Sequence, residues 1–171
     1  MGPFLSPLGR GDWRRRLDNT MRLLIAAVGR AKPGPHLELQ RFYAERLAWD
    51  LAIAEVEERR KLAAAERRER EAELLLGKIP ERAFVIALDE RGSVLSSAIF
   101  AQKLARWRDG GMDLAFLIGG ADGHGEAVRR RADFTLSLGP MTWPHLLVRG
   151  MLLEQLYRAQ QILAGHPYHR E

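Results

Sequence analysis

The chain has 171 residues, of which 46% are hydrophobic, and a net charge of +5; this length suits one domain with its own core. It contains no cysteine, which excludes disulfides, thiolate metal sites and cysteine nucleophiles and suits a reducing cytosol. No apolar run approaches the ~20 residues needed to cross a bilayer, so we expect a soluble cytoplasmic protein. The basic first twenty residues account for part of the charge, and the +3 that remains does not by itself indicate a nucleic-acid partner.

Residues 1–20 are rich in glycine, proline and arginine and lack the apolar segment of a secretory signal. Two interpretations have similar weight. Either Met21 is the natural start of the protein, or the segment is a disordered basic arm. In both cases we expect residues 1–20 to be an extension and residues 21–171 to form a single domain.

Short apolar runs bounded by glycine, proline or charged residues alternate along the chain with stretches of helical spacing. In chain order we expect a strand at 22–28, a helix after the breaker 32–35 to about Trp49, a strand at 51–56, a helix at 59–76, a strand at 83–88, a helix at 96–109, a strand at 113–118, a helix after Gly125, a strand at 134–138 and a helix at 145–163. Such alternation predicts an α/β fold, with a mainly parallel sheet flanked by helices and ligands at the carboxyl ends of the strands.

Two polar segments are interpreted as surface features. Within 59–76 the arginines alternate with glutamates, which favours a solvated, salt-bridged helix face over an RNA-binding one. The segment 89–92 (DERG) follows the third predicted strand and is typical of a turn at the carboxyl edge of the sheet.

A glycine-rich segment, 119–125 (GGADGHG), follows a buried strand and leads into the helix that carries Arg129, Arg130 and Arg131. Four glycines in seven residues let the backbone approach a ligand closely or adopt positive φ. The spacing matches neither Gly-x-Gly-x-x-Gly nor the P-loop, so dinucleotide binding and nucleotide hydrolysis lose support. A tight strand-to-helix turn without a ligand is the alternative, and the density of glycines favours a ligand loop.

A second irregular loop, 138–145 (LGPMTWPH), leads into the last helix. Pro144 suits the first helical turn, and Thr142 is a candidate N-cap. Because both loops follow strands of a parallel sheet, we expect them to meet at the same edge.

The last helix, 145–163, carries an apolar surface wider than a single stripe. Homodimerisation through this helix is the economical explanation. Glu154 and Arg158 are expected to form an i,i+4 ion pair.

The terminal segment 166–171 (HPYHRE) concentrates titratable and aromatic groups. A metal site formed by His145, His166 and His169 is conceivable, but Pro167 and the freedom of a chain end argue against preset geometry, and no metal is expected. Serine-histidine-aspartate catalysis has no support, since the chain lacks a Gly-x-Ser-x-Gly nucleophile elbow.

Four segments taken together resemble one family: 117–123 (LIGGADG), 141–145 (MTWPH), 156–159 (LYRA) and the terminal HPYHRE. This is the RlmH family of SPOUT-class methyltransferases, which modify a pseudouridine of large-subunit ribosomal RNA. The resemblance covers residues 21–171, and the ordered set is highly specific, above all the tail. The chain departs from the family in residues 1–20 and at Gly139-Pro140, where the family more often has serine followed by another residue.

The resemblance implies an S-adenosyl-L-methionine-dependent enzyme that methylates N3 of a pseudouridine in 23S ribosomal RNA within the assembled ribosome. It also implies a homodimer with a C-terminal trefoil knot, which composition could not have suggested. The cofactor site carried over from the family comprises Leu88, Gly120, Gly139, Pro140, Met141, Thr142, Trp143 and Pro144. Backbone amides and apolar walls of this kind suit an adenine ring, and the chemistry requires no metal.

For the RNA, the resemblance points to the tail. Tyr168, His169 and Arg170 are the candidates for gripping and orienting the target, reaching the site from the partner subunit. His169 is the candidate base for the imide proton, and Arg170 stabilises the developing imidate or binds phosphate.

Two other functions stay open. One is a methyltransferase of the same class that acts on another RNA, such as transfer RNA. The other is a ribosome-associated binding protein without catalysis, which the absence of S-adenosylmethionine binding would favour.

Overall fold

The structure, a computed structural model, describes residues 21–169. The expected extension 1–20 and the candidate Arg170 lie outside these residues. The strands are β1 (Arg22–Val28), β2 (Asp50–Val56), β3 (Phe84–Val94), β4 (Leu114–Ile118) and β5 (Phe134–Ser137). The helices are α1 (Pro35–Ala44), α2 (Ala64–Leu76), α3 (Ser97–Asp109), α4 (Glu126–Arg131) and α5 (His145–Leu163), followed by a 3₁₀ turn, η1 (Pro167–His169).

The five strands form one sheet in the order β2-β1-β4-β3-β5, and all neighbouring strands are parallel. The predicted α/β fold with a parallel sheet and flanking helices is therefore confirmed. The trefoil knot stays a prediction. Among residues 21–169, no helix combines the length and the apolar character that a membrane span requires.

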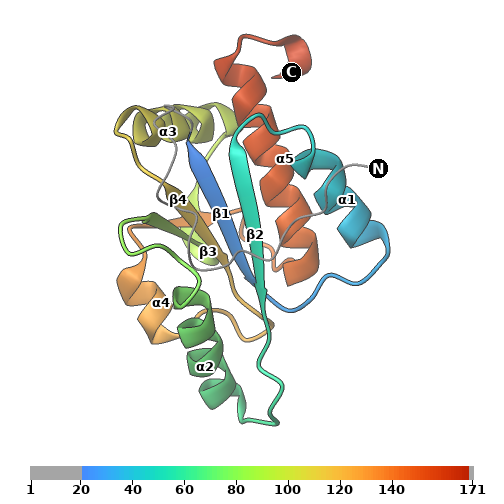
Figure 1. The fold of residues 1–171 in the computed structure, drawn as a ribbon, viewed down its shortest axis with the longest axis vertical. Helices are drawn as coiled ribbons and strands as arrows, with labels where there is room; N and C mark the ends of the chain where they lie inside the picture. The colour runs from blue at the N-terminus through green and yellow to red at the C-terminus, as the bar shows by residue number, and fades with distance from the viewer. Residues whose placement is uncertain (1–20, 170–171) are drawn as a thin grey trace.

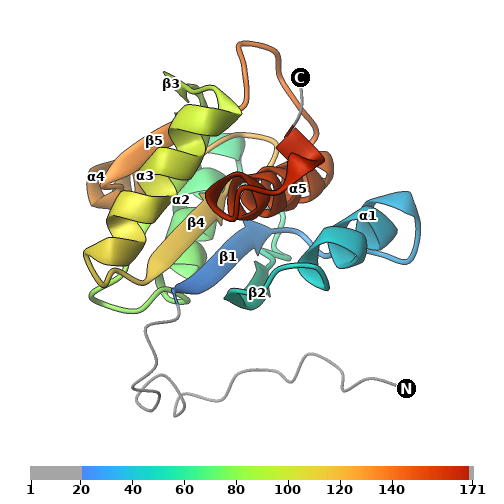
Figure 2. The same cartoon turned by 90° about the horizontal axis from the view of Figure 1, so that it is seen from above.

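Helices cover both faces of the sheet, as a fully buried parallel sheet requires. Alternate residues of β1 belong to two separate apolar cores: Leu23, Ile25 and Ala27 pack with α3 and α5, whereas Leu24 and Ala26 pack with α2 and α4. Figures 1 and 2 show α1, α5 and α3 side by side over the first of these faces. The near-continuous apolar sequence of β1 follows from this burial on both sides.

Helix α5 lies between α1 and α3, over the sheet (Figure 2). Its side chains Leu152, Leu153, Leu156 and Ala159 are fully buried in the core of a single chain. Most of its wide apolar surface is thus covered within the chain, so this width alone does not require a second subunit. The predicted ion pair is present, with Arg158 Nη2 2.6 Å from Glu154 Oε1.

Two predicted helix boundaries are wrong. Helix α1 ends at Ala44, well short of Trp49. Helix α2 begins at Ala64 instead of residue 59, because the preceding charges pair locally, as Arg60 does with Glu58. These short-range ion pairs satisfy the charged residues without a helix.

The predicted turn at 89–92 is also wrong, because these residues continue β3 to Val94. The register with β5 shifts between Leu88 and Ser93, so the strand bulges there. A glycine is needed at position 92, where a Cβ would come within 2.8 Å of the Thr135 and Leu136 backbone. Residues 89–92 thus interrupt the pairing of β3 with β5 instead of ending the strand, because Ser93 and Val94 pair with β5 again.

Candidate active site

A cleft of about 810 Å³ lies at the carboxyl edge of the sheet, where β3, β4 and β5 end. It is bordered by the glycine-rich loop 119–125, by the bulge of β3 and by the loop 138–144 with the first turn of α5. The two loops that were expected to meet at one edge of the sheet do meet there. Its apolar lining consists of Leu88, Ile118, Leu136, Leu138, Met141, Trp143 and Val148.

The glycine-rich loop is a tight turn held by its own backbone. The Gly123 N–H donates to the Gly120 carbonyl over 3.1 Å, and Gly123 has a φ of +75°, which favours glycine. A Cβ at Gly120 would lie 2.9 Å from Glu71 Oε2 and 3.1 Å from Val28 Cγ1. Gly120 and Gly123 are thus required by the turn and by its packing. The backbone of the loop also borders the cleft.

Helix α2 supports this loop from behind. Arg67 Nη2 lies 2.6 Å from Asp122 Oδ2, and the Glu69 carboxylate accepts the Glu126 N–H at the start of α4. Glu71 is 7% exposed, and burial raises its pKa. These contacts come from the arginine- and glutamate-rich sequence that was interpreted as a solvated face, so part of that face is a scaffold for the cleft.

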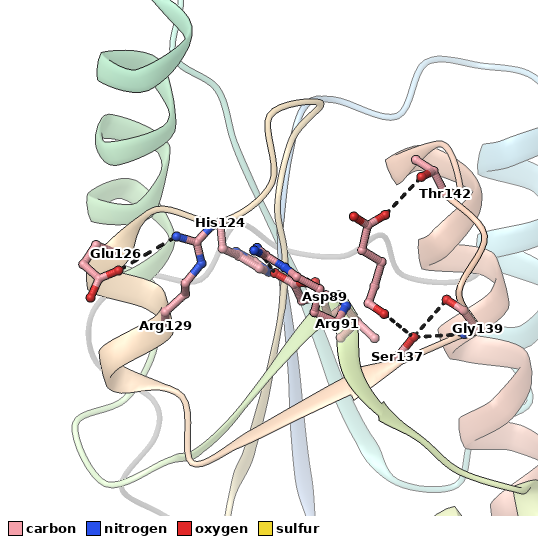
Figure 3. A network of polar contacts seen from close by, with 10 residues as sticks. Asp89, Arg91, His124, Glu126, Arg129, Ser137, Gly139 and Thr142 are labelled. Atoms are coloured by element: carbon pink, nitrogen blue, oxygen red, sulfur yellow. Dashed lines mark hydrogen bonds and ion pairs between the residues drawn. The ribbon is translucent and has the colours of Figure 1, made fainter.

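Glu90, in the bulge of β3, holds the loop 138–144 in place. Figure 3 shows Thr142, Ser137 and Gly139 of this contact. Its carboxylate accepts a hydrogen bond from Thr142 Oγ1 over 3.0 Å, and its carbonyl oxygen lies 3.1 Å from Ser137 Oγ. Ser137 Oγ also accepts the Gly139 N–H at 3.1 Å. The predicted N-cap role of Thr142 is wrong: Pro144 precedes the helix without a side-chain cap, and the Thr142 hydroxyl is used across the cleft.

His124 connects the glycine-rich loop to the end of β3 (Figure 3). Its Nε2 lies 3.0 Å from the Leu88 carbonyl oxygen, and the residue is only 2% exposed. Burial lowers the pKa of the imidazole, which is neutral at physiological pH. A neutral ring with a proton on Nε2 donates to Leu88 and fixes one wall of the cleft.

Stability is expected to fall as the pH drops below about 6.5, the pKa of an ordinary histidine. The unfolded chain takes up a proton on His124 there, while the folded protein, with its lowered pKa, does not. In His124→Gln the side-chain amide still donates to Leu88, but the side chain no longer titrates. The decrease in the free energy of unfolding between about pH 7.5 and pH 5 should therefore be smaller than in the wild type by up to about 2 kcal/mol. Urea denaturation at both pH values measures this, and an unchanged pH dependence would contradict the buried neutral ring.

Charged side chains alternate in sign around the cleft. Burial opposes ionisation of Asp89, but hydrogen bonds from Arg91 outweigh it and lower the Asp89 pKa. Arg129, which is exposed, lies 3.9 Å from Glu126, and Arg68 completes the rim. Burial, followed by the charge of Arg149, lowers the pKa of His145. The cleft therefore presents guanidinium and carboxylate groups together with apolar walls.

Residues 166–168, the part of the tail whose side chains the structure describes, do not line the cleft of their own chain. Helix α5 begins at the cleft and ends 19 residues later, a length of about 28 Å. Tyr168 folds back against the second half of α5, where its ring centroid is 4.9 Å from that of Tyr157 and its hydroxyl is 3.4 Å from Glu154. Figure 1 shows the C-terminus at the end of α5 remote from the carboxyl edge of the sheet.

This separation also bears on the conceivable metal site, because His145 and His166 lie at opposite ends of α5. Among residues 21–169, no group of three or more His, Asp or Glu side chains is arranged to hold a metal ion. His169 ends the 3₁₀ turn.

Seven of the eight candidate cofactor residues border the cleft; Pro140 does not. The polar groups that sequence reasoning missed are Asp89, Glu90, Arg91 and His124. The first three were assigned to a turn, and no local pattern indicates that Glu90 meets Thr142 across 52 positions. His124 stands within the glycine-rich loop, yet its burial depends on the packing of β3 against β4.

Comparison with known proteins agrees with this geometry. The model of a family described as predicted SPOUT methyltransferase matches residues 21–169. Ribosomal RNA large subunit methyltransferase H of Rhodospirillum centenum is 60% identical over 151 residues, 88% of this chain and 99% of that protein. The proteins of the same name from Paramagnetospirillum magneticum and Rhodospirillum rubrum are 61% and 58% identical with the same coverage.

Two solved structures of the SpoU methyltransferase AviRb from Streptomyces viridochromogenes also align. The first has a TM-score of 0.43 at 15% identity, covering 86% of this chain and 62% of that one. The second, in complex with AdoMet, has a TM-score of 0.48 at 16% identity, covering 91% and 63%. The family assignment does not depend on these alignments. On the match to the family model and the identity to full-length relatives, the chain belongs to the SPOUT methyltransferase family.

Proposed function

We propose that this protein methylates N3 of a pseudouridine in 23S ribosomal RNA, in the assembled ribosome of the cytoplasm, as a homodimer. The coarser statement follows from the family and its named relatives: the chain is an S-adenosylmethionine-dependent methyltransferase of large-subunit ribosomal RNA. The observation that carries the finer proposal is 60% identity across 99% of a relative's length, together with a cofactor-sized cleft at the expected loops.

The residues of the cleft fit S-adenosylmethionine. Cofactor sites usually occupy about 300–1,000 Å³, have apolar walls and contain a few polar groups, and the volume of about 810 Å³ falls in this range. Leu88, Leu138 and Trp143 supply apolar surface, while the glycine-rich loop and residues 138–144 supply backbone donors and acceptors. When bound, the cofactor's sulfonium supplies an electrophilic methyl group.

The residues of the chain must then orient the RNA and remove a proton from N3. Burial and a hydrogen bond with Tyr43 raise the pKa of Tyr168 to about 12. Tyr168 therefore stays protonated and donates hydrogen bonds, so it suits gripping the nucleotide better than accepting its proton. His169 as base and Arg170 as the cation that stabilises the imidate remain the proposed roles.

The position of Tyr168 supports a homodimer. Tyr168 packs against the second half of α5 and not at the cleft of its own chain, so a role for it in a cleft requires that of another subunit. Large apolar side chains are also exposed on α1, β3 and α3: Phe42 is 48% exposed, Val94 66% and Ile99 43%. Val94 borders a groove of about 410 Å³ that α1, α3 and α5 contribute to. This surface suits a subunit interface.

The proposal is tested by supplying S-adenosylmethionine with a labelled methyl group to the purified protein. The acceptors are intact ribosomes, isolated 23S ribosomal RNA and transfer RNA, and the labelled nucleoside is identified by mass spectrometry. We expect labelled 3-methylpseudouridine from intact ribosomes and little label elsewhere, because residues 21–169 form one sheet with its flanking helices and no separate RNA-binding domain, and so depend on a folded target. Labelled transfer RNA, or no cofactor binding at all, would overturn the proposal.

Removal of the Thr142 hydroxyl is expected to weaken cofactor binding. Thr142→Val keeps the shape of the side chain and loses the hydrogen bond to Glu90 that fixes the loop. One hydrogen bond of about 1 kcal/mol corresponds to a roughly fivefold higher Kd, measured by calorimetry with S-adenosylmethionine. Thr142→Ser retains the hydroxyl and should bind as the wild type does; an equal loss in both variants would show that the bond is unimportant.

A further inference from the structure

The loop between β1 and α1, residues 29–34, lies next to residues that line the cleft but belongs to none of the predicted motifs. Ala27 is in register with Ile118, so Gly29 lies beside the start of the glycine-rich loop. On its other side, a Cβ at Gly29 would be 3.0 Å from Nε2 of His145, which lines the cleft. Figure 1 shows this loop leaving the sheet next to the first turn of α5.

A buried arginine fixes the loop. Arg149 of α5 is 1% exposed, and its Nη2 donates to the Val28 and Gly29 carbonyls over 2.7 and 2.6 Å. Its Nη1 lies 2.6 Å from Glu55 Oε1, which also accepts the Ala31 N–H at 2.8 Å. Burial of an ion pair is weak support for stability, because desolvation offsets the attraction. The arrangement instead holds a short loop at a defined place beside the cleft.

The loop carries exposed positive charge. Arg30 and Lys32 are both exposed, and within residues 21–169 no carboxylate lies within ion-pair distance of either. In the neighbouring loop after β2, Arg59 and Arg60 are neutralised by Glu57 and Glu58, and Lys61 is exposed without a carboxylate partner among the described residues. Arg30 and Lys32 are thus two uncompensated cations on one short loop, the loop that Arg149 holds.

We propose that Arg30 and Lys32 bind backbone phosphates of the RNA strand that flanks the target nucleotide, with Arg149 and Glu55 as positioning residues. This inference rests on the proposed function, because it names the RNA contact of that same site. Phosphate contacts position a nucleic acid without reading its sequence. Two cations on a loop whose backbone is held next to the cleft set the register of the strand while other groups hold the target base.

The test compares Arg30→Ala/Lys32→Ala with Lys78→Ala/Arg82→Ala. The control pair also combines one exposed lysine and one exposed arginine, but it lies between α2 and β3, at the opposite edge of the sheet. We expect the KM for ribosomes to rise on the order of tenfold in the first variant, with kcat and cofactor affinity unchanged. The dependence of log(kcat/KM) on log salt concentration should become shallower by about 1 to 2. The charge-preserving swap Arg30→Lys/Lys32→Arg should restore both values.

Two outcomes would overturn the inference. One is a KM and salt dependence indistinguishable from the control variant; the other is an equal change in both, which would reflect net charge alone. Ribosome binding is also measured by co-sedimentation without cofactor. If the wild type binds ribosomes and transfers no methyl group, the proposed function fails, and the binding of the two variants still decides whether this loop contacts RNA.

Discussion

Two inactive variants are expected to regain activity when they are produced in the same cell. One lacks residues 166–171 and keeps an intact cleft. The other carries Ala121→Trp, which places an indole at the exposed rim of the cleft and blocks the cofactor while the tail remains. A mixed dimer then combines the cleft of one subunit with the tail of its partner.

Random pairing makes half of the dimers mixed, and each has one functional site, so activity should recover to about a quarter of the wild-type value. Methyl transfer to ribosomes is measured for each variant and for the co-expressed pair. The tail-deleted protein must still bind S-adenosylmethionine by calorimetry. Absence of recovery in mixed dimers, or full activity of the tail-deleted protein alone, would contradict a site shared between subunits.

Substitution of Arg149 by methionine is expected to lower the free energy of unfolding by about 3 kcal/mol. The change removes a fully buried guanidinium and leaves the Val28 and Gly29 carbonyls and the Glu55 carboxylate without their donor. Urea denaturation measures the effect, which should appear as a lower midpoint with an unchanged m-value.

Arg158→Met is the matched control, because Arg158 lies on the same helix and also pairs with a glutamate. That pair is i,i+4, and the arginine side chain is 31% exposed, so its loss should lower stability by less than about 1 kcal/mol. An equal decrease in the free energy of unfolding for both substitutions would show that the contacts of Arg149 stabilise the protein no more than a surface ion pair does.

Strands and helices with strong local patterns could be predicted from the sequence. The apolar runs of β1 and β4 indicated strands buried on both faces, and α5 has the predicted bounds. The errors fall where tertiary contacts outweigh local preference. Residues 89–92 have turn composition, yet β5 supplies hydrogen-bonding partners that extend β3 past them.

In the candidate site too, features with a local sequence pattern could be predicted, whereas contacts between distant residues could not. Both cofactor loops could be placed at one edge, since parallel strands bring their carboxyl ends together. The Glu90 contact with Thr142 and the Arg149 contact with Glu55 join positions 52 and 94 apart, and nothing local indicates them. The sequence likewise gives no sign that α5 separates the tail from the cleft, because this depends on how the helix crosses the sheet.

The strand order has a consequence for how the chain acquires its structure. The central pairing of the sheet joins β1 to β4, and Arg22 meets Asp113 from a position 91 residues away. During synthesis, the apolar strand β1 is made long before β4, so it stays unpaired on this side until residues 114–118 have been synthesised. Proteins dominated by such distant pairings fold slowly and expose apolar surface meanwhile. Refolding should therefore be slow for a domain of this size, with aggregation as its main competitor at high protein concentration.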